Sequence, residues 1–266
     1  MNDELILLTP WDLGLAAGLV LLLAALSWQL RLGIGRRILV AAARSTVQLL
    51  LLGLVLKALF NTANLGLVAL LAAIMLGVAG YEVMARQKHR LKGPWGYGAG
   101  TVSMLLSSFS ITLLALWVVL QPAPWYAPQY SIPLLGMLLG NTMTGIAVAL
   151  DNLTSRTLEK RYEIEARLAL GQNANEAIAD IRRDALRAGL IPIVNSMTTA
   201  GIVSLPGMMT GQILAGSPPM EAAKYQLLIL FLIAAGTGLG SVTAVMIGSR
   251  RVFDDRDRLR RDRLTS

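Results

Sequence analysis

The chain has 266 residues, of which 55% are hydrophobic and only 15% are charged, and its net charge at pH 7 is +8. A soluble domain carries about 25% charged residues, so the composition indicates a membrane protein. The positive net charge would suit nucleic-acid binding, but the charges lie in short gaps between long apolar runs, which makes that interpretation weak. The absence of cysteine excludes disulfides, thiolate metal sites and thiol catalysis, and the single histidine, His89, excludes a mechanism that needs two imidazoles.

Seven apolar runs are long enough to cross a bilayer, for which an α-helix needs about 20 residues. Helices are expected because the runs are continuous and every backbone group must be satisfied inside lipid. The expected spans are Leu13–Leu30, Ile38–Leu56, Leu65–Met84, Tyr97–Leu120, Ile132–Leu150, Gly189–Leu214 and Gln226–Ile247. The start Asn2-Asp3-Glu4 is acidic, unlike a signal peptide, so the first run is expected to be a retained span. The sequence therefore predicts an all-α polytopic fold with one transmembrane domain over residues 1–266.

Lysine and arginine alternate between the two sides of these spans. They concentrate in residues 31–37, 86–92, 156–187 and 250–263, whereas the intervening loops 61–64, 121–131 and 215–224 hold only Lys224. The positive-inside rule then places the N-terminus outside and the tail, residues 248–266, in the cytoplasm. Because Asp254–Arg263 alternates in sign, the tail is expected to be a solvated helix or a disordered end.

Several spans carry glycines four residues apart, a spacing that lets helix backbones approach closely. These pairs are Gly14/Gly18, Gly96/Gly100, Gly136/Gly140, Gly207/Gly211 and Gly236/Gly240. Tight packing within one chain is the preferred interpretation. The alternative is that some of these faces join two copies of the chain.

Residues 151–187, between the fifth and sixth spans, form the only sizeable segment outside the membrane. Arg156–Leu170 has helical character, Gly171 breaks it, and Asn173 or Asn175 is suited to cap a second helix that runs into the sixth span. We expect a helix–glycine–helix elbow that stands off the membrane. The alternative is an amphipathic hairpin that lies on the bilayer surface.

The elbow carries Glu165-Ala166-x4-Gly171, which resembles the cytoplasmic coupling loop of ABC-transporter permeases, whose core is Glu-Ala-Ala, three residues and Gly. Arg167 replaces the second Ala, and Pro192 matches the following proline only loosely. The stretch Gly201-Ile-Val-Ser-Leu-Pro-Gly-Met-Met-Thr-Gly-Gln-Ile-Leu-Ala-Gly216 strongly resembles the FetB-like permease family, the membrane subunits of a bacterial ABC exporter associated with iron. The resemblance also includes Ala43-Arg44-x-x-Val47-Gln48-Leu49 and Pro133…Gly140-Asn141.

This resemblance implies a bacterial inner-membrane permease that exports iron or another metal. It implies a homodimer of the chain paired with a separate ATP-binding subunit, which would bind ATP and Mg, and a coupling role for Glu165, Ala166 and Gly171. The plant relatives resemble aluminium-tolerance transporters, so the cargo is not uniform. The chain itself contains no Gly-x4-Gly-Lys-Ser/Thr loop, so energy is expected from a partner or an ion gradient, and the chain is expected to have no enzymatic activity and no cofactor of its own.

Polar groups inside lipid are costly and usually face a cavity or a partner. The candidate pathway residues are Asn141, Asn195, Ser204, Pro206, Met208 and Met209. The sixth span is expected to break at Pro206-Gly207, which frees carbonyl groups. Ferric iron prefers oxygen ligands to thioethers, so the oxygens of Asn141, Asn195 and Ser204 are preferred as transient contacts, and the methionines are assigned to packing. No tight metal site is expected, because the spans lack a dense carboxylate cluster.

Arg44 lies near the inner boundary of the second span, where we expect a structural ion pair with Glu82 or Asp151 rather than a substrate contact. Two other functions compete with an ABC permease. An ion-coupled secondary transporter would need an intramembrane acid, and only Glu82 and Asp151 come near to that role. A non-transporting membrane scaffold would explain the elbow but not the polar, proline-broken spans.

Overall fold

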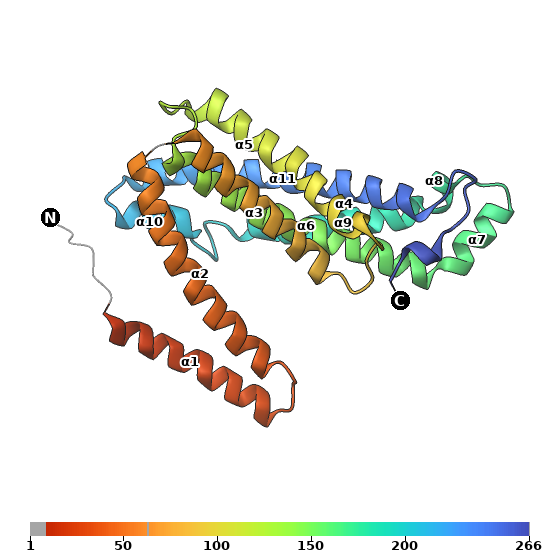
Figure 1. Cartoon of the computed structure of the whole chain (residues 1–266), viewed down its shortest axis with the longest axis horizontal. Helices are drawn as coiled ribbons and strands as arrows, with labels where there is room; N and C mark the ends of the chain where they lie inside the picture. The colour runs from red at the N-terminus through yellow and green to blue at the C-terminus, as the bar shows by residue number, and fades with distance from the viewer. Residues whose placement is uncertain (1–8, 63, 266) are drawn as a thin grey trace. The chain divides into compact units, whose positions relative to one another are not determined.

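A computed structural model describes residues 9–62 and 64–265. In this part of the chain every regular element is a helix, and the only β-type pairings are three isolated bridges, which confirms the all-α fold (Figure 1). The described residues form two compact units. One contains residues 9–62 with Leu214–Gly216, and the other contains Asn64–Ile213 with residues 217–265.

The first unit is a helical hairpin of α1, Pro10–Gln29, and α2, Gly35–Thr62. A capping box begins α1, because the Asp12 carboxylate accepts from the Thr9 backbone N–H at 2.8 Å and the Thr9 hydroxyl accepts from the Asp12 N–H. The two helices meet closely next to their connection. A Cβ added to Gly35 would lie 2.8 Å from Nε1 of Trp28, so only glycine fits there.

The second unit is built around one long helix. Its helices are α3 (Leu65–Arg86), α4 (Pro94–Met104), η1 (Leu105–Phe109), α5 (Ser110–Leu114), η2 (Ala115–Leu120), α6 (Pro128–Glu159), α7 (Arg161–Ala169), α8 (Ala174–Ala177), α9 (Ala179–Thr199), α10 (Gly207–Leu214), α11 (Pro219–Val252) and η3 (Arg261–Arg263). The central helix is α6, which packs against α3, α9 and α11. Its residues Leu138, Ile146, Leu150 and Leu153 recur at helical spacing, and at most 1% of each is exposed.

Six helical segments of the described chain are long and apolar enough to cross a membrane: α1, α2, α3, Pro94–Leu120, α6 and α11. They correspond to six of the seven predicted runs. The structure differs from the prediction in the remaining run, Gly189–Leu214, which contains two helices instead of one. α9 ends at Thr199, seven residues before the expected break, although α10 does begin at Gly207.

Local hydrogen bonds explain the early end of α9. The Thr199 carbonyl accepts from the N–H groups of Val203 and Ser204 at 3.0 and 3.2 Å, and the Ser204 carbonyl accepts from Gly201. This turn needs a positive φ at Gly201, which is +81°. Pro206 has no N–H to continue a helix. Glycine and proline together therefore produce a seven-residue interruption.

Two of the glycine pairs lie at close helix crossings within the chain, as the preferred interpretation requires. A Cβ added to Gly100 would lie 2.7 Å from Val83, and one added to Gly240 would lie 2.6 Å from Thr142. Added Cβ atoms on Gly14, Gly18, Gly207 and Gly211 would meet no described atom within 4 Å. For these positions, a role between two copies of the chain stays a prediction.

Residues 254–263 are mostly exposed, as expected of a solvated tail, but they fold back as a hairpin instead of forming a long helix, and both of its ends are anchored. The Lys92 N–H donates to the Arg263 carbonyl at 2.8 Å, and the Thr265 N–H donates to the Arg90 carbonyl at 2.9 Å. Phe253 and Leu264 are buried at 6% and 3% exposure. The alternating charges of this segment gave no indication that Phe253 and Leu264 are buried.

A close crossing of two backbones joins α6 and α9 and yields a stability prediction. A Cβ on Gly189 would lie 2.7 Å from the Gly145 carbonyl oxygen and 2.8 Å from the Ala149 Cβ, so Gly189→Ala must separate the two helices. We expect a loss of about 1–3 kcal/mol in the free energy of unfolding, measured as a lower unfolding temperature in detergent. Gly140→Ala is the matched control on α6, where an added Cβ meets no described atom within 4 Å. Equal unfolding temperatures for the two variants would contradict the crossing.

Candidate coupling surface and transport pathway

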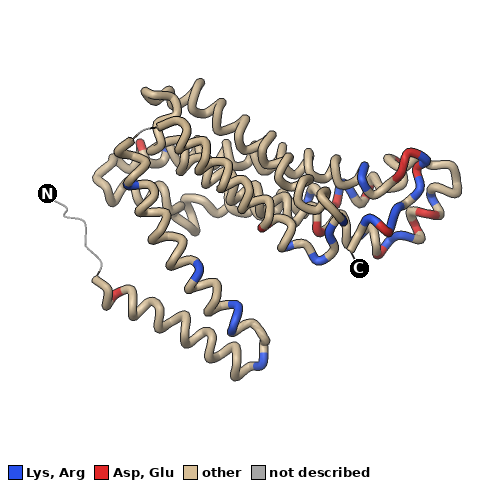
Figure 2. Tube along the Cα trace, viewed as in Figure 1, with Lys and Arg blue, Asp and Glu red and all other residues tan. Residues whose placement is uncertain are grey.

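Most charged residues of the second unit gather at one end of its helices (Figure 2). We call this the basic end. It comprises the loop 87–93 after α3, the segment 160–187, and the C-terminal residues 250–265. The predicted elbow lies here, formed by the C-terminal part of α6 together with α7, α8 and the start of α9.

The elbow turns at Gly171, as predicted. The Gly171 N–H donates to the Leu168 carbonyl at 3.0 Å, and the Gln172 N–H donates to the Arg167 carbonyl at 3.1 Å. These two bonds form a Schellman motif, which requires a left-handed residue after the helix. The φ of Gly171 is +92°. Asn173 then caps α8, accepting from the Glu176 N–H at 3.0 Å.

The apolar stripe of the elbow is buried inside the protein. Ile164 of α7 and Ile178, Ile181 and Ala185 around the start of α9 are all at most 5% exposed, and they belong to the same apolar cluster as Leu153 of α6. The elbow therefore packs on the extension of α6, and these side chains are not free to lie on a bilayer surface. This geometry agrees with an elbow that stands off the membrane.

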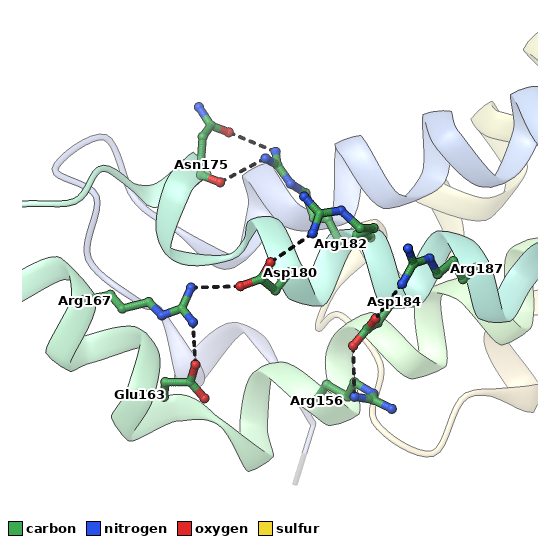
Figure 3. A network of polar contacts seen from close by, with 9 residues as sticks. Arg156, Glu163, Arg167, Asn175, Asp180, Arg182, Asp184 and Arg187 are labelled. Atoms are coloured by element: carbon green, nitrogen blue, oxygen red, sulfur yellow. Dashed lines mark hydrogen bonds and ion pairs between the residues drawn. The ribbon is translucent and has the colours of Figure 1, made fainter.

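Ion pairs tie the three helices of the elbow together (Figure 3). The guanidinium of Arg167 lies 2.7 Å from Glu163 within α7 and 3.2 Å from Asp180 of α9. Arg156 of α6 lies 3.2 Å from Asp184 of α9. A single exposed pair contributes only about 0–1 kcal/mol. Because these pairs link α6, α7 and α9 above a buried apolar face, they hold the turn at Gly171 in one place.

The three predicted coupling residues, Glu165, Ala166 and Gly171, are all exposed on this elbow. In the described part of the chain, no residue forms an ion pair or hydrogen bond with the Glu165 carboxylate. Leu170, next to the turn, is 86% exposed. The end of α7 thus presents an acid, a small residue and a leucine on a rigid support, which suits binding to another protein.

The predicted pathway residues Asn141 and Asn195 lie on neighbouring antiparallel helices. Their helices cross at Gly145 and Gly189, and counting about 1.5 Å per residue from there puts the two asparagines at about the same depth. Both are exposed. The Asn141 amide donates to the Met137 carbonyl at 2.8 Å. Ser204 lies in the interruption after α9.

The remaining predicted pathway residues lie at the start of α10. The Pro206 carbonyl accepts from the Thr210 N–H at 3.1 Å, and Met209 is half-buried. Met208 packs against an apolar cluster and lines a cavity of about 330 Å³ with Met137 and Gln212. The described residues contain no group of three or more His, Cys, Asp or Glu side chains arranged to hold a metal ion.

One polar feature was missed by the sequence analysis. The hydroxyl groups of Ser108, Thr142, Thr237 and Ser241 are buried between η1, α6 and α11, and none has a hydrogen-bond partner among the described residues. Two signals pointed to it: Thr237 and Ser241 are four residues apart beside Gly236 and Gly240, and such hydroxyls often lie at helix contacts in membranes.

The predicted ion pair of Arg44 with Glu82 or Asp151 stays a prediction. Arg44 is in α2 of the first unit, whereas both acids are in the second. Within the second unit, Glu82 lies 3.9 Å from Arg86, and the Asp151 carboxylate accepts from the Lys88 N–H at 2.6 Å. Asp151 therefore anchors the loop after α3 to α6.

Comparisons with known proteins agree over nearly the whole chain. A family described as "Uncharacterised protein family (UPF0014)" matches residues 10–253. A UPF0014 membrane protein of Synechocystis is 40% identical over 97% of this chain and 99% of its own length. The probable iron export permease protein FetB of Escherichia coli is 31% identical over 95% of each chain, and the protein ALUMINUM SENSITIVE 3 of Arabidopsis thaliana is 34% identical over 87% of this chain and 84% of its own. No solved structure matches significantly. This chain is a multi-pass membrane protein of the UPF0014 family.

Proposed function

We propose that the chain is the permease subunit of an ABC transporter that exports iron or another metal, driven by a separate ATPase subunit that binds ATP and Mg. The observation that carries this proposal is the elbow. It is a rigid helix end, fixed by buried apolar residues and ion pairs, and it exposes Glu165, Ala166 and Gly171 at the basic end. A separate ATPase subunit needs such a surface, because its conformational change moves the permease only if the contacted segment is rigid.

The relatives support the same function. One is named as a probable iron export permease and another as a protein of aluminium sensitivity. Both names concern metals, so a metal cargo is the simplest common proposal. The sequence lacks the Gly-x4-Gly-Lys-Ser/Thr loop that cradles ATP phosphates, which agrees with a motor on another chain.

We further propose the topology that the charges favour. The basic end, with the elbow and the C-terminus, faces the cytoplasm across a bacterial inner membrane, and the N-terminus lies outside. ATP is then available where the elbow is exposed. Two copies of the chain would assemble with two ATPase subunits, by analogy with other ABC transporters.

The cargo would pass along the face of α6 and α9 that carries Asn141 and Asn195 and then past Ser204 in the interruption. These groups offer neutral oxygens, which hard cations accept as ligands. Weak contacts suit an exporter, because it must release its cargo. The buried hydroxyl groups of Thr142 on α6 and Ser241 on α11 would become further oxygen ligands for the cargo if these two helices separate during transport.

The first test is reconstitution of the chain with a co-expressed ABC ATPase subunit in proteoliposomes loaded with single metals. We expect transport that requires ATP and persists in the presence of an uncoupler, and we expect the transported metal to stimulate ATP hydrolysis. Transport by the chain alone, or transport that collapses with an uncoupler and ignores ATP, would show a secondary transporter instead.

The second test separates coupling from assembly at Glu165. Glu165→Ala should lower the amount of metal transported per ATP hydrolysed, because the ATPase loses a charged contact at the elbow. Glu159→Ala is the matched control, since Glu159 is an exposed acid at the end of α6, outside the proposed contact. The ratio of transport to hydrolysis is the readout. An equal ratio for both variants would remove Glu165 from the coupling surface.

A further inference from the structure

The C-terminal tail forms a hairpin next to the elbow. An antiparallel bridge joins Phe253 and Leu259, and the Arg260 N–H donates to the Val252 carbonyl at 2.8 Å. The Asp254 carboxylate closes the turn by accepting from the N–H groups of Arg258 and Arg256 at 2.9 and 3.0 Å. These bonds, chiefly that from the Arg258 N–H, lower the pKa of Asp254 to about 2. The turn is therefore held by an ionised carboxylate at neutral pH.

The hairpin is also anchored beyond its turn. One nitrogen of the Arg263 guanidinium donates to the carbonyls of Arg251 and Phe253 at 3.0 and 2.8 Å, which satisfies backbone groups at the end of α11. Leu264 is buried and bridges to Leu91. With its base fixed to α11 and to the loop after α3, the turn 254–258 has a defined position.

This turn faces the elbow across a groove. Arg256, Asp257, Arg258 and Leu259 line one side, and Glu165, Leu168 and Gln172 line the other, around a volume of about 410 Å³. The two walls of the groove therefore come from parts of the second unit that are distant in sequence. One wall contains the predicted coupling residue Glu165.

Some charged side chains that line the groove form ion pairs within the chain, and others do not. Arg258 is neutralised by Asp254 at 2.8 Å. Among the described residues, nothing pairs with the guanidinium of Arg256 or with the carboxylate of Glu165, and both side chains are exposed. Half-buried Leu168 and Leu259 supply apolar surface between them. A partner that fills this groove must bring an acidic group to Arg256 and a basic group or N–H donor to Glu165.

We propose that this groove is the seat of the ATPase subunit and that the C-terminal tail forms half of it. The inference rests on the proposed function and extends it, since a coupling loop alone would leave Arg256 without a role. The occupant is a segment of the ATPase with charges opposite to Arg256 and Glu165 and an apolar side chain between them. The tail then contacts the ATPase subunit, and movement of that subunit is transmitted through the tail to α11 and to the loop after α3.

The chain has no cysteine, so single-cysteine variants test this surface without background labelling. Gln172→Cys reports the elbow wall and Arg256→Cys reports the tail wall. Arg261→Cys is the matched control, an exposed arginine of the same tail that does not line the groove. Each variant is labelled with a fluorescent maleimide in nanodiscs, with and without the ATPase subunit. We expect labelling of both groove positions to slow by about tenfold in the complex, and labelling of Arg261→Cys to stay unchanged.

Charge reversal gives a second readout. Arg256→Glu should weaken binding of the ATPase by about tenfold, whereas Arg261→Glu, with the same change in net charge, should not. If the ATPase binds and protects Gln172→Cys but not Arg256→Cys, the tail is not part of the seat, although the proposed function stands. If Arg256→Cys is already protected by the lipid of the nanodisc, the groove faces the membrane and the inference fails. If no ATPase binds to the unmodified chain, the proposed function itself fails.

Discussion

The length of α6 is the constraint on which the basic end depends. Its 32 residues span about 48 Å at 1.5 Å per residue, whereas the hydrocarbon core of a bilayer is about 30 Å thick. The helix must therefore leave the membrane, and its residues Leu153–Glu159 provide an apolar and charged base outside it. On this base pack Ile164, Ile178 and Ile181, which are the reason that a short elbow keeps one conformation.

A second consequence follows from the same helix. Because α6 contacts α3, α9 and α11 along its length, a displacement at the elbow reaches the interior of the second unit through a packed helix rather than through a loop. The crossing at Gly145 and Gly189 leaves no room for a side chain, so α6 and α9 are in direct backbone contact. The interruption after Thr199 begins ten residues after Gly189, so α9 ends well away from this crossing.

The sequence predicted the helices and the elbow well because their signals are local. Runs of apolar residues define the spans, and the turn at Gly171 was predicted from a glycine that ends one helix and an asparagine that caps the next. The ends of the helices were predicted less accurately than their presence. The α9 break began early because the hydrogen bonds around Thr199 depend on a turn that no periodicity reveals. The hairpin of the tail was missed for a similar reason: Leu264 is isolated among charges, and its burial depends on the loop after α3, more than 160 residues away in the chain. The hydroxyl groups of Thr142, Thr237 and Ser241 come together only when α6 and α11 pack against each other.

Hydrogen–deuterium exchange of the chain in nanodiscs, with and without its ATPase subunit, tests the central claim most directly. The claim is that a rigid basic end, built on α6, receives the motor. It predicts slower exchange on binding in residues 163–176 and in residues 254–259, with no change in the loop 121–127 at the other end of the second unit. Protection confined to that loop, or no protection anywhere in a complex shown to be assembled, would contradict it.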